Sequence, residues 1–253
     1  MRAALIVNPV GTDEDENLQA VRGAVSSAAA AGANLVVLPE TAITGLVNNG
    51  DPAHDLPLGK AIPGPLTDEL AKLAQRCGLH LAIGLFERTG NALYDSAVLL
   101  SPQGHMLLHY RRIQPQWHGP RVDPAVYRQG SRVPAADTPL GRFAIILCGD
   151  LFDDDVVSRV CVARPDWLLL PLARCFGEGS YDQERWDRDE LPLYLERLRA
   201  VGCPTLMVNY FSEPDCNAYF GGALVVSALG EVMASWPLGQ AGTLLVDLRA
   251  RGG

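Results

Sequence analysis

Short apolar runs alternate along this chain with longer segments in which apolar residues recur at helical spacing. Residues 2–8 form the first apolar run, which predicts a buried strand. An acidic stretch at residues 13–16 then opens a predicted helix with an alanine-rich face, and Gly32 is its expected stop. A second buried strand is predicted at residues 34–40, where Pro39 ends the apolar run. This order of strand, helix and strand is typical of an α/β fold.

The middle of the chain predicts a long loop, one helix and an antiparallel meander. Glycine, proline, asparagine and aspartate are frequent in residues 41–65, and loops of that length in compact domains are often functional. Thr67 is the predicted N-cap of a helix that ends at Gly78. Residues 113–141 are rich in proline and glycine and predict an irregular excursion. Apolar segments joined by turn residues predict three strands, at 80–86, 93–100 and 105–110.

The second half of the chain repeats the pattern of the first. A strand is predicted at 142–147 and a helix at 154–164, and residues 166–172 then repeat the polar, apolar and proline pattern of residues 34–40. Two related αβ halves account for this repetition. Because no linker or low-complexity segment separates them, we predict one domain over residues 1–253. The remaining predicted elements are a helix at about 184–201 and strands at 204–208, 220–227, 232–235 and 244–248.

Charge and composition exclude several kinds of partner. A formal net charge of −8 and the absence of a Lys/Arg-rich run argue against nucleic acid. No apolar run approaches the ~18 residues that suggest a transmembrane helix, and the N-terminus is typical of a strand and not of a signal peptide. The six cysteines show no CxxC pair and no metal-ligand spacing, which fits free thiols in a reducing compartment. We therefore expect a cytoplasmic protein that binds neither nucleic acid nor membrane.

Cys148 is the first candidate for chemistry, because it stands at the abrupt end of a predicted buried strand. Gly149 follows it and allows a sharp turn or a close approach to a ligand. Three aspartates at 153–155 then precede a predicted helix, where capping and the helix dipole favour them. Backbone N–H groups at such a position can stabilise a thiolate. The alternative interpretation is a small, inert and buried hydrophobic residue.

Glu40 and Arg112 also stand at predicted strand ends. A carboxylate at the position of Glu40 can accept a thiol proton and later pass it to a leaving amine. A cation such as Arg112 near the nucleophile can stabilise the oxyanion of a tetrahedral intermediate. The competing interpretations are that Glu40 caps a helix and that Arg112 lies on a solvated face.

Taken together, these motifs resemble the carbon–nitrogen hydrolase (nitrilase) superfamily. The segments that carry the resemblance are Leu38-Pro39-Glu40, Tyr110-Arg111-Arg112 and Leu147-Cys148-Gly149-Asp150. Residues 84–88 and 93–97 resemble the segment "G-x-x-E-R … Y-N-S-A" of that superfamily, and the later landmarks are Arg199-Ala200, Asn209 and residues 222–230. The resemblance implies a four-layer αββα sandwich with a Glu–Lys–Cys triad. It also implies a homodimer or a higher homo-oligomer.

The sequence departs from the superfamily pattern where the chemistry lies. Arg112 replaces the expected lysine, and the chain's two lysines, Lys60 and Lys72, both precede the predicted meander. Arginine keeps the positive charge but is larger and does not readily release a proton. Asp123 stands where a second glutamate is expected, and Gly149 stands where an aromatic residue is frequent.

The resemblance further implies a mechanism without a metal or an organic cofactor. Glu40 takes the proton of Cys148, the thiolate attacks a small amide, and Arg112 with the Gly149 N–H holds the oxyanion. A thioester forms, and Glu40, positioned by Asp123, activates the water that hydrolyses it. Nitrile hydrolysis or acyl transfer through the same thioester is an alternative. A catalytically weakened family member that binds a ligand is a third hypothesis.

Candidate substrate-binding residues lie in two loops. Arg174 follows the second strand–proline pattern and has the fork geometry that binds a carboxylate, although a solvated surface position is the alternative. His118 is equally consistent with a structural loop histidine. The full set of candidates is Trp117, His118 and Arg121 after Arg112, and Arg174, Glu178 and Tyr181 in the second half.

Overall fold

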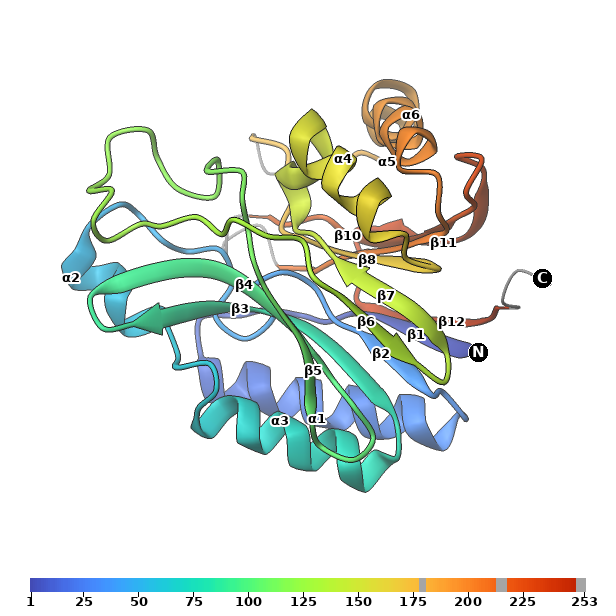
Figure 1. Cartoon of the computed structure of the whole chain (residues 1–253), viewed down its shortest axis with the longest axis horizontal. Coiled ribbons are helices and arrows are strands. Elements are labelled where there is room, and N and C mark those ends of the chain that lie inside the picture. Colours follow the sequence, from blue (N-terminus) through green and yellow to red (C-terminus); the bar gives the residue numbers. More distant parts are fainter. Residues whose placement is uncertain (178–180, 213–217, 249–253) are drawn as a thin grey trace.

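The computed structural model describes residues 1–177, 181–212 and 218–248 and arranges them in four layers (Figure 1). Two six-stranded sheets within these residues form the inner layers. Helices α1 (Glu14–Ala30) and α3 (Pro65–Cys77) cover the outer face of one sheet. Helices α4 (Asp154–Ala163) and α6 (Leu191–Val201) cover the outer face of the other. The predicted αββα sandwich is confirmed.

The first sheet contains the early strands of the chain and one strand from its end. Its order is β12 (Gly242–Asp247), β1 (Arg2–Val7), β2 (Leu35–Val37), β3 (His80–Thr89), β4 (Ala92–Leu100) and β5 (Met106–Arg111). Strands β1, β2 and β3 are parallel, and β4 and β5 extend the sheet in antiparallel fashion. The predicted meander is therefore confirmed.

The second sheet repeats the plan of the first. Its order is β11 (Val232–Leu238), β10 (Gly221–Val226), β9 (Thr205–Asn209), β8 (Trp167–Leu172), β7 (Gly141–Ile145) and β6 (Ala135–Thr138). Strands β7, β8 and β9 are parallel, as β1, β2 and β3 are in the first sheet. The two strand–proline segments, in β2 with its following loop and in β8, thus occupy equivalent positions in two related halves.

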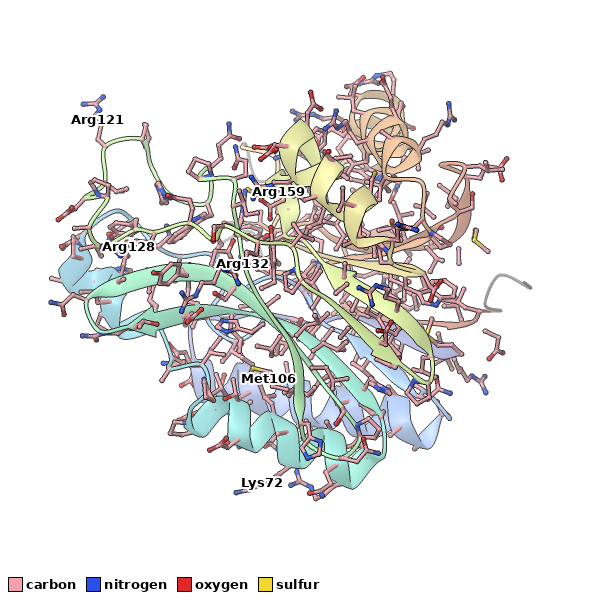
Figure 2. The ribbon with its side chains drawn as sticks, viewed as in Figure 1. Lys72, Met106, Arg121, Arg128, Arg132 and Arg159 are labelled. Atoms are coloured by element: carbon pink, nitrogen blue, oxygen red, sulfur yellow. The ribbon has the colours of Figure 1, made fainter. Side chains whose placement is uncertain are left out.

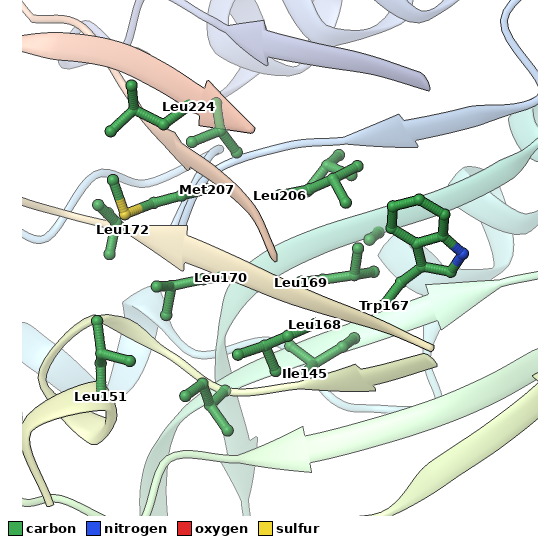
Figure 3. Packing of buried hydrophobic residues seen from close by; sticks show 14 of the residues in the cluster. Ile145, Leu151, Trp167, Leu168, Leu169, Leu170, Leu172, Leu206, Met207 and Leu224 are labelled. Atoms are coloured by element: carbon green, nitrogen blue, oxygen red, sulfur yellow. The ribbon is translucent and has the colours of Figure 1, made fainter. Parts of the chain in front are cut away.

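The alternating side chains of the strands build two apolar layers. In β1, Ala3, Leu5 and Val7 belong to the core that includes both sheets, whereas Ala4 and Ile6 pack with the helix face of the first sheet. Figure 3 shows the core around β8, where four successive residues are fully or almost fully buried. The burial of these side chains from water holds the strand ends in place.

Local structure differs from the sequence predictions at several points. The predicted loop at 41–65 contains a short helix, α2 (Pro52–Asp55), and a 3₁₀ turn (Leu56–Leu58), and the predicted excursion at 113–141 contains β6. Helix α3 begins at Pro65, which suits a first helical turn, so Thr67 is not its N-cap. Thr67 instead accepts the Gly64 N–H on its hydroxyl at 2.8 Å.

The helix predicted at 184–201 is divided into three parts. They are α5 (Gln183–Arg185), a π-helical turn (Trp186–Glu190) and α6. Pro192 lies in the first turn of α6, where its missing N–H is tolerated, and this accounts for a new helix start at that point. Across the described ranges, no helix combines the length and the apolar character needed to cross a membrane.

Candidate active site

The ends of three strands bring Glu40, Arg112 and Cys148 to one place between the sheets. Glu40 follows β2 and Arg112 follows β5 in the first sheet, and Cys148 follows β7 in the second. Nη1 of Arg112 donates a hydrogen bond to Oε1 of Glu40 at 2.8 Å. Both side chains are buried, with exposed fractions of 4% for Arg112 and 0% for Glu40. The thiol of Cys148 is close enough to Glu40 to raise the pKa of the Glu40 carboxyl group, so all three groups lie together.

Cys148 occupies a strained backbone position. It begins a 3₁₀ turn (Cys148–Phe152) with a φ of 40°, in the left-handed region that residues other than glycine rarely adopt. Thr41, directly after Glu40, has a similar φ of 44°. Strained non-glycine residues of this kind cluster at functional sites because the surrounding structure must hold them. Cys148 therefore occupies a strained position, and Glu40 directly precedes one.

Asp150 fixes the turn that carries Cys148. Its Oδ2 accepts the Tyr110 hydroxyl at 2.6 Å and the Leu147 N–H at 3.1 Å. Its Oδ1 accepts the N–H groups of Ile113 at 3.2 Å and Gln114 at 2.8 Å. Burial raises the pKa of Asp150, and the Tyr110 hydrogen bond opposes that rise. This one carboxyl group thus ties the turn that carries Cys148 to the segment that follows Arg112.

Gly84 of β3 sets the path of the chain at Glu40. The N–H of Gly84 donates to the Pro39 carbonyl at 2.9 Å, and its own carbonyl accepts the Ala42 N–H at 3.1 Å. A Cβ atom at Gly84 would lie 2.4 Å from the Glu40 Cα. Because real Cβ atoms essentially never come that close to backbone, only glycine lets the Glu40 segment cross β3 here.

Gly149 leaves the space that the Arg112 guanidinium fills. A Cβ atom at Gly149 would lie 2.5 Å from Nη2 of Arg112 and 3.2 Å from Oε1 of Gln114. Nη2 also donates to the same Gln114 oxygen at 3.4 Å. Two departures from the superfamily pattern, the arginine and the glycine, are therefore in direct contact. The small residue accommodates the larger cation.

Burial dominates the electrostatics of Glu40. Burial is the largest of the effects that together bring the pKa of Glu40 up to about 8; the nearby Cys148 also raises it, and the Arg112 charge partly offsets the rise. A carboxyl group with a pKa close to neutral pH can both accept and return a proton, which suits general acid–base catalysis. Arg112, by contrast, stays charged, because the surrounding acidic groups raise its pKa although burial lowers it.

Asp95 is a further buried group at the site, and the sequence motifs alone gave it no role. It lies on β4 with an exposed fraction of 0%, and its carbonyl accepts the Arg112 N–H at 2.8 Å. Its carboxyl oxygen Oδ2 lies 3.3 Å from Nη1 of Arg112. The signal that identifies it is its place in the motif at 93–97, where aspartate stands at the asparagine position.

A separate buried carboxylate, Glu87, stabilises the neighbouring strands. It accepts hydrogen bonds from Ser96 at 2.7 Å and from the Arg111 Nε at 2.9 Å, and it contacts His109. Burial raises the pKa of Glu87, but these hydrogen bonds outweigh it and lower the pKa to about 2. The group is therefore ionised at neutral pH and joins β3, β4 and β5.

The sequence profile described as carbon–nitrogen hydrolase matches residues 2–252, almost the whole chain. This chain belongs to the carbon–nitrogen hydrolase family. It is thus an enzyme that acts on C–N bonds other than peptide bonds, and the resemblance found in its motifs is confirmed.

Curated relatives of this carbon–nitrogen hydrolase include both nitrilases and amidases. Nitrilase 2 of Arabidopsis thaliana is 24% identical, over 98% of this chain and 80% of its own length. The aliphatic nitrilase of Sinorhizobium fredii (strain HH103) is 27% identical, over 92% of this chain and 81% of its own length. The deaminated glutathione amidase of Mus musculus is 26% identical, over 88% of this chain and 70% of its own length.

Solved structures share the fold of this carbon–nitrogen hydrolase. A carbon–nitrogen hydrolase from Helicobacter pylori G27 superposes with a TM-score of 0.82 at 21% identity, covering 97% of this chain and 88% of that one. A mutant amidase from Nesterenkonia sp. AN1, with acrylamide added at its active-site cysteine, gives a TM-score of 0.80 at 21% identity. That match covers 99% of this chain and 94% of the amidase.

The structure does not place Asp123 with the other predicted catalytic groups. Its side chain is exposed, and its Oδ1 accepts the Ala125 N–H at 2.8 Å within a turn. The buried carboxyl group that contacts both Arg112 and Glu40 is Asp95. The prediction that Asp123 positions Glu40 therefore finds no support in this geometry. A short polar side chain at the start of a turn satisfies the local backbone instead.

Trp117 and His118 belong to an aromatic cluster in the loop that follows Arg112. The Trp117 ring lies 4.8 Å from the His118 ring and 5.9 Å from the Tyr127 ring, measured between centroids. Nδ1 of His118 is 2.9 Å from the Gly119 carbonyl, a local contact typical of a loop histidine. Arg121 points outward from this loop and is exposed (Figure 2). The structure thus gives Trp117 and His118 packing partners, and their role toward substrate stays a prediction.

Arg174 and Tyr181 lie on the second half of the molecule. Arg174 pairs with Glu190, with Nε 3.1 Å from Oε2, and its N–H donates to the Asn209 side chain at 2.9 Å. Tyr181 donates its hydroxyl proton to the Ser212 carbonyl. Because Arg174 already has a carboxylate partner, its proposed pairing with substrate would compete with Glu190. Glu178 lies outside the described residues.

Among the described residues, no group of three or more His, Cys, Asp or Glu side chains is arranged to hold a metal ion.

Proposed function

We propose that this carbon–nitrogen hydrolase is an amidase that cleaves a small linear amide through a thioester on Cys148. The observation that carries the proposal is the buried ion pair of Glu40 and Arg112 beside the thiol. A nucleophile, a proton acceptor with a pKa near neutral and a fixed cation together are what acyl transfer needs. The mutant amidase from Nesterenkonia sp. AN1, in which acrylamide has added to the active-site cysteine, supports the assignment of a reactive thiol.

The first half of the reaction forms the thioester. Ionised Glu40 accepts the Cys148 proton, and the thiolate attacks the amide carbon, so that the carbonyl oxygen becomes an oxyanion. Arg112 and the Gly149 N–H stabilise that charge. The C–N bond then breaks, protonated Glu40 gives its proton to the leaving nitrogen, and ammonia or an amine departs.

The second half returns the enzyme to its starting state. Glu40, again ionised, accepts a proton from water, and the resulting hydroxide equivalent attacks the thioester carbon. The C–S bond breaks, Glu40 returns the proton to sulfur, and the carboxylic acid leaves. Each step uses Glu40 alternately as base and acid, which its raised pKa permits.

Nitrile hydrolysis is the second candidate reaction, because two of the relatives above are nitrilases. Attack of the thiolate on a nitrile carbon gives a thioimidate, and addition of water with loss of ammonia leads to the same thioester. Transfer of the acyl group to another acceptor would differ only in the last step. The products separate these reactions.

Intact-protein mass after brief exposure to a panel of small amides and nitriles tests the proposal. We expect a gain of one acyl group in the wild type and none in Cys148→Ala, together with ammonia release that the variant lacks. Cys161→Ala is the matched control, because Cys161 is an exposed free cysteine on α4 and its removal should leave the adduct intact. An adduct that survives in Cys148→Ala would overturn the assignment. No adduct and no ammonia across the panel would favour a ligand-binding protein.

A further inference from the structure

The Arg112 side chain bridges two buried carboxyl groups. Its Nη1 donates to Glu40 Oε1 at 2.8 Å and to Asp95 Oδ2 at 3.3 Å. The two carboxyl side chains have exposed fractions of 0%, so water does not compensate their charges. Two carboxylates facing a single guanidinium would leave one buried negative charge without a counterion, which is strongly unfavourable.

Each of the two carboxyl groups has one oxygen that does not contact Arg112, and these two oxygens indicate where a proton is held. In the described part of the chain, Glu40 Oε2 and Asp95 Oδ1 are buried and receive no hydrogen bond from an N–H or hydroxyl donor. The two side chains are nevertheless close enough to share a hydrogen bond with each other. A carboxyl–carboxylate contact of this kind is stable when one member is protonated and donates to the other.

We propose that Asp95 is a positioning residue that keeps its proton during turnover and donates it to the Glu40 carboxylate. With ionised Glu40, protonated Asp95 and charged Arg112, the three side chains carry no net charge. The proposal rests on the function proposed above for Glu40 and deepens it. Asp95 orients the base from one side while Arg112 holds it from the other, so the Glu40 carboxylate faces the thiol before substrate binds.

A protonated aspartate has the hydrogen-bonding capacity of an asparagine. The C=O oxygen of the side chain accepts a hydrogen bond from Arg112, and the side-chain O–H donates one to Glu40. The oxygen and the NH₂ group of an asparagine amide would do the same. Residue 95 stands at the asparagine position of the motif that resembles "Y-N-S-A". The proposal therefore explains how an acidic residue can occupy that position beside another acid.

The electrostatic surroundings of Asp95 agree with this arrangement. Burial raises the pKa of Asp95 well above its ordinary value, and the adjacent Glu40 charge raises it further, while Arg112 lowers it. The other titratable groups that face Asp95 are Asp150, on the turn that begins at Cys148, and Tyr110 on β5. Asp150 has its own donors, including the Tyr110 hydroxyl.

The catalytic activity of two variants, Asp95→Asn and Asp95→Ala, provides the first test. Asp95→Asn keeps the acceptor and the donor, so we expect kcat/KM within about threefold of wild type. Asp95→Ala removes both hydrogen bonds and should lower kcat/KM by at least about 10-fold, because the loss of even one hydrogen bond to a charged group costs that much. Asp137→Asn is the matched control at an exposed aspartate of β6, outside the site. If Asp95→Asn lost as much activity as Asp95→Ala, residue 95 would be needed as an anion and the proposal would be overturned.

Infrared spectroscopy provides a second test that needs no substrate and is therefore independent of the proposed function. At about pH 9, exposed carboxyl groups and Glu40 are ionised, whereas Asp95 should remain protonated. We expect a protonated-carboxyl band in the wild type and in Asp137→Asn, a shift of that band to lower frequency when the aspartate carboxyl carbons are labelled with ¹³C, and its loss in Asp95→Asn. A band that persists in Asp95→Asn, or that ¹³C-labelled aspartate does not shift, would overturn the assignment of the proton to Asp95. Should Asp95→Asn not fold, a wild-type spectrum without any such band overturns it equally.

Discussion

At the scale of single residues, the site depends on which atoms fit beside the Arg112 guanidinium. Arginine is bulkier than lysine and carries a second terminal nitrogen, Nη2, that needs its own space. Gly149 provides that space, since a Cβ atom there would come within 2.5 Å of Nη2. Arg112 and Gly149 are therefore energetically coupled, and the effect of substituting one should depend on which residue stands at the other position.

Gly149→Ala should lower kcat/KM by about 100-fold, because the added methyl group displaces a buried guanidinium that is already held by Glu40. Arg112→Lys lacks Nη2, so the same alanine should cost much less in that background. Steady-state kinetics of the two single variants and the double variant measure this coupling. Equal losses in both backgrounds would show that the two residues act independently.

The pKa of Glu40 predicts the pH dependence of the first chemical step. Glu40 must be ionised to accept the thiol proton, and burial has raised its pKa to about 8. We therefore expect kcat/KM to rise with pH and to level off near that value. The charged and titratable groups around Glu40 are Arg112, Asp95, Cys148 and the tyrosines Tyr194, Tyr210 and Tyr219. A profile that levels off near pH 4.5, the ordinary pKa of a glutamate, would contradict this account.

At the scale of secondary structure, the position of each chemical group follows from strand ends and from close crossings. Glu40 follows the parallel strand β2 of the first sheet, and Cys148 follows the parallel strand β7 of the second, so each lies beyond the carboxyl end of a parallel strand. The crossing of the Glu40 segment over β3 depends on Gly84. The close approach arises from the way β3 and the segment after β2 pack together, and neither Glu40 nor Gly84 produces it alone.

Gly84→Ala should lower both stability and activity. Its Cβ atom would meet backbone atoms of Pro39 and Glu40, which cannot move aside as a flexible side chain would. We expect a loss of about 1–3 kcal/mol in the free energy of unfolding, as for other overpacked sites. Denaturant unfolding and kcat/KM are the measurements. Gly119→Ala is the control, because nothing lies within 4 Å of a Cβ atom there.

The sequence allowed prediction of the strands, their two related halves and the three residues at strand ends, because alternation and turn chemistry are local signals. Asp95 and Asp123 show where this reasoning stops. Spacing along the chain favoured Asp123, since it follows Arg112 in the order that the superfamily pattern suggests. Only strand pairing reveals that the Arg112 N–H binds the Asp95 carbonyl and that the two side chains meet. Contacts between residues distant in sequence are set by register, which a single sequence does not display.

At the scale of the whole molecule, the site lies where the two sheets meet and takes groups from both. The side chains of Glu40, Asp95 and Arg112 come from the first sheet, and Cys148 comes from the second. A common apolar core includes residues of both sheets, among them Leu5 of β1 and Leu168 of β8. The proposed mechanism therefore requires that the sheets pack against each other as they do here.

We predict that the chain unfolds in one cooperative transition, as a single domain over residues 1–253 would. In a urea titration, loss of activity, circular dichroism and tryptophan fluorescence should follow the same curve. The shared core explains the expectation, because neither sheet can keep its inner face buried without the other. Two separate transitions would show that the halves are independent units.

The hydrogen bonds of Asp150 imply an order of events in time. The turn that carries Cys148 is held by N–H groups of Ile113 and Gln114, which belong to the other half of the chain. The turn can reach its strained shape only after β5 has docked, so the reactive thiol should mature in the last stage of folding. We expect rapid alkylation of Cys148 to return later than secondary structure when the protein refolds.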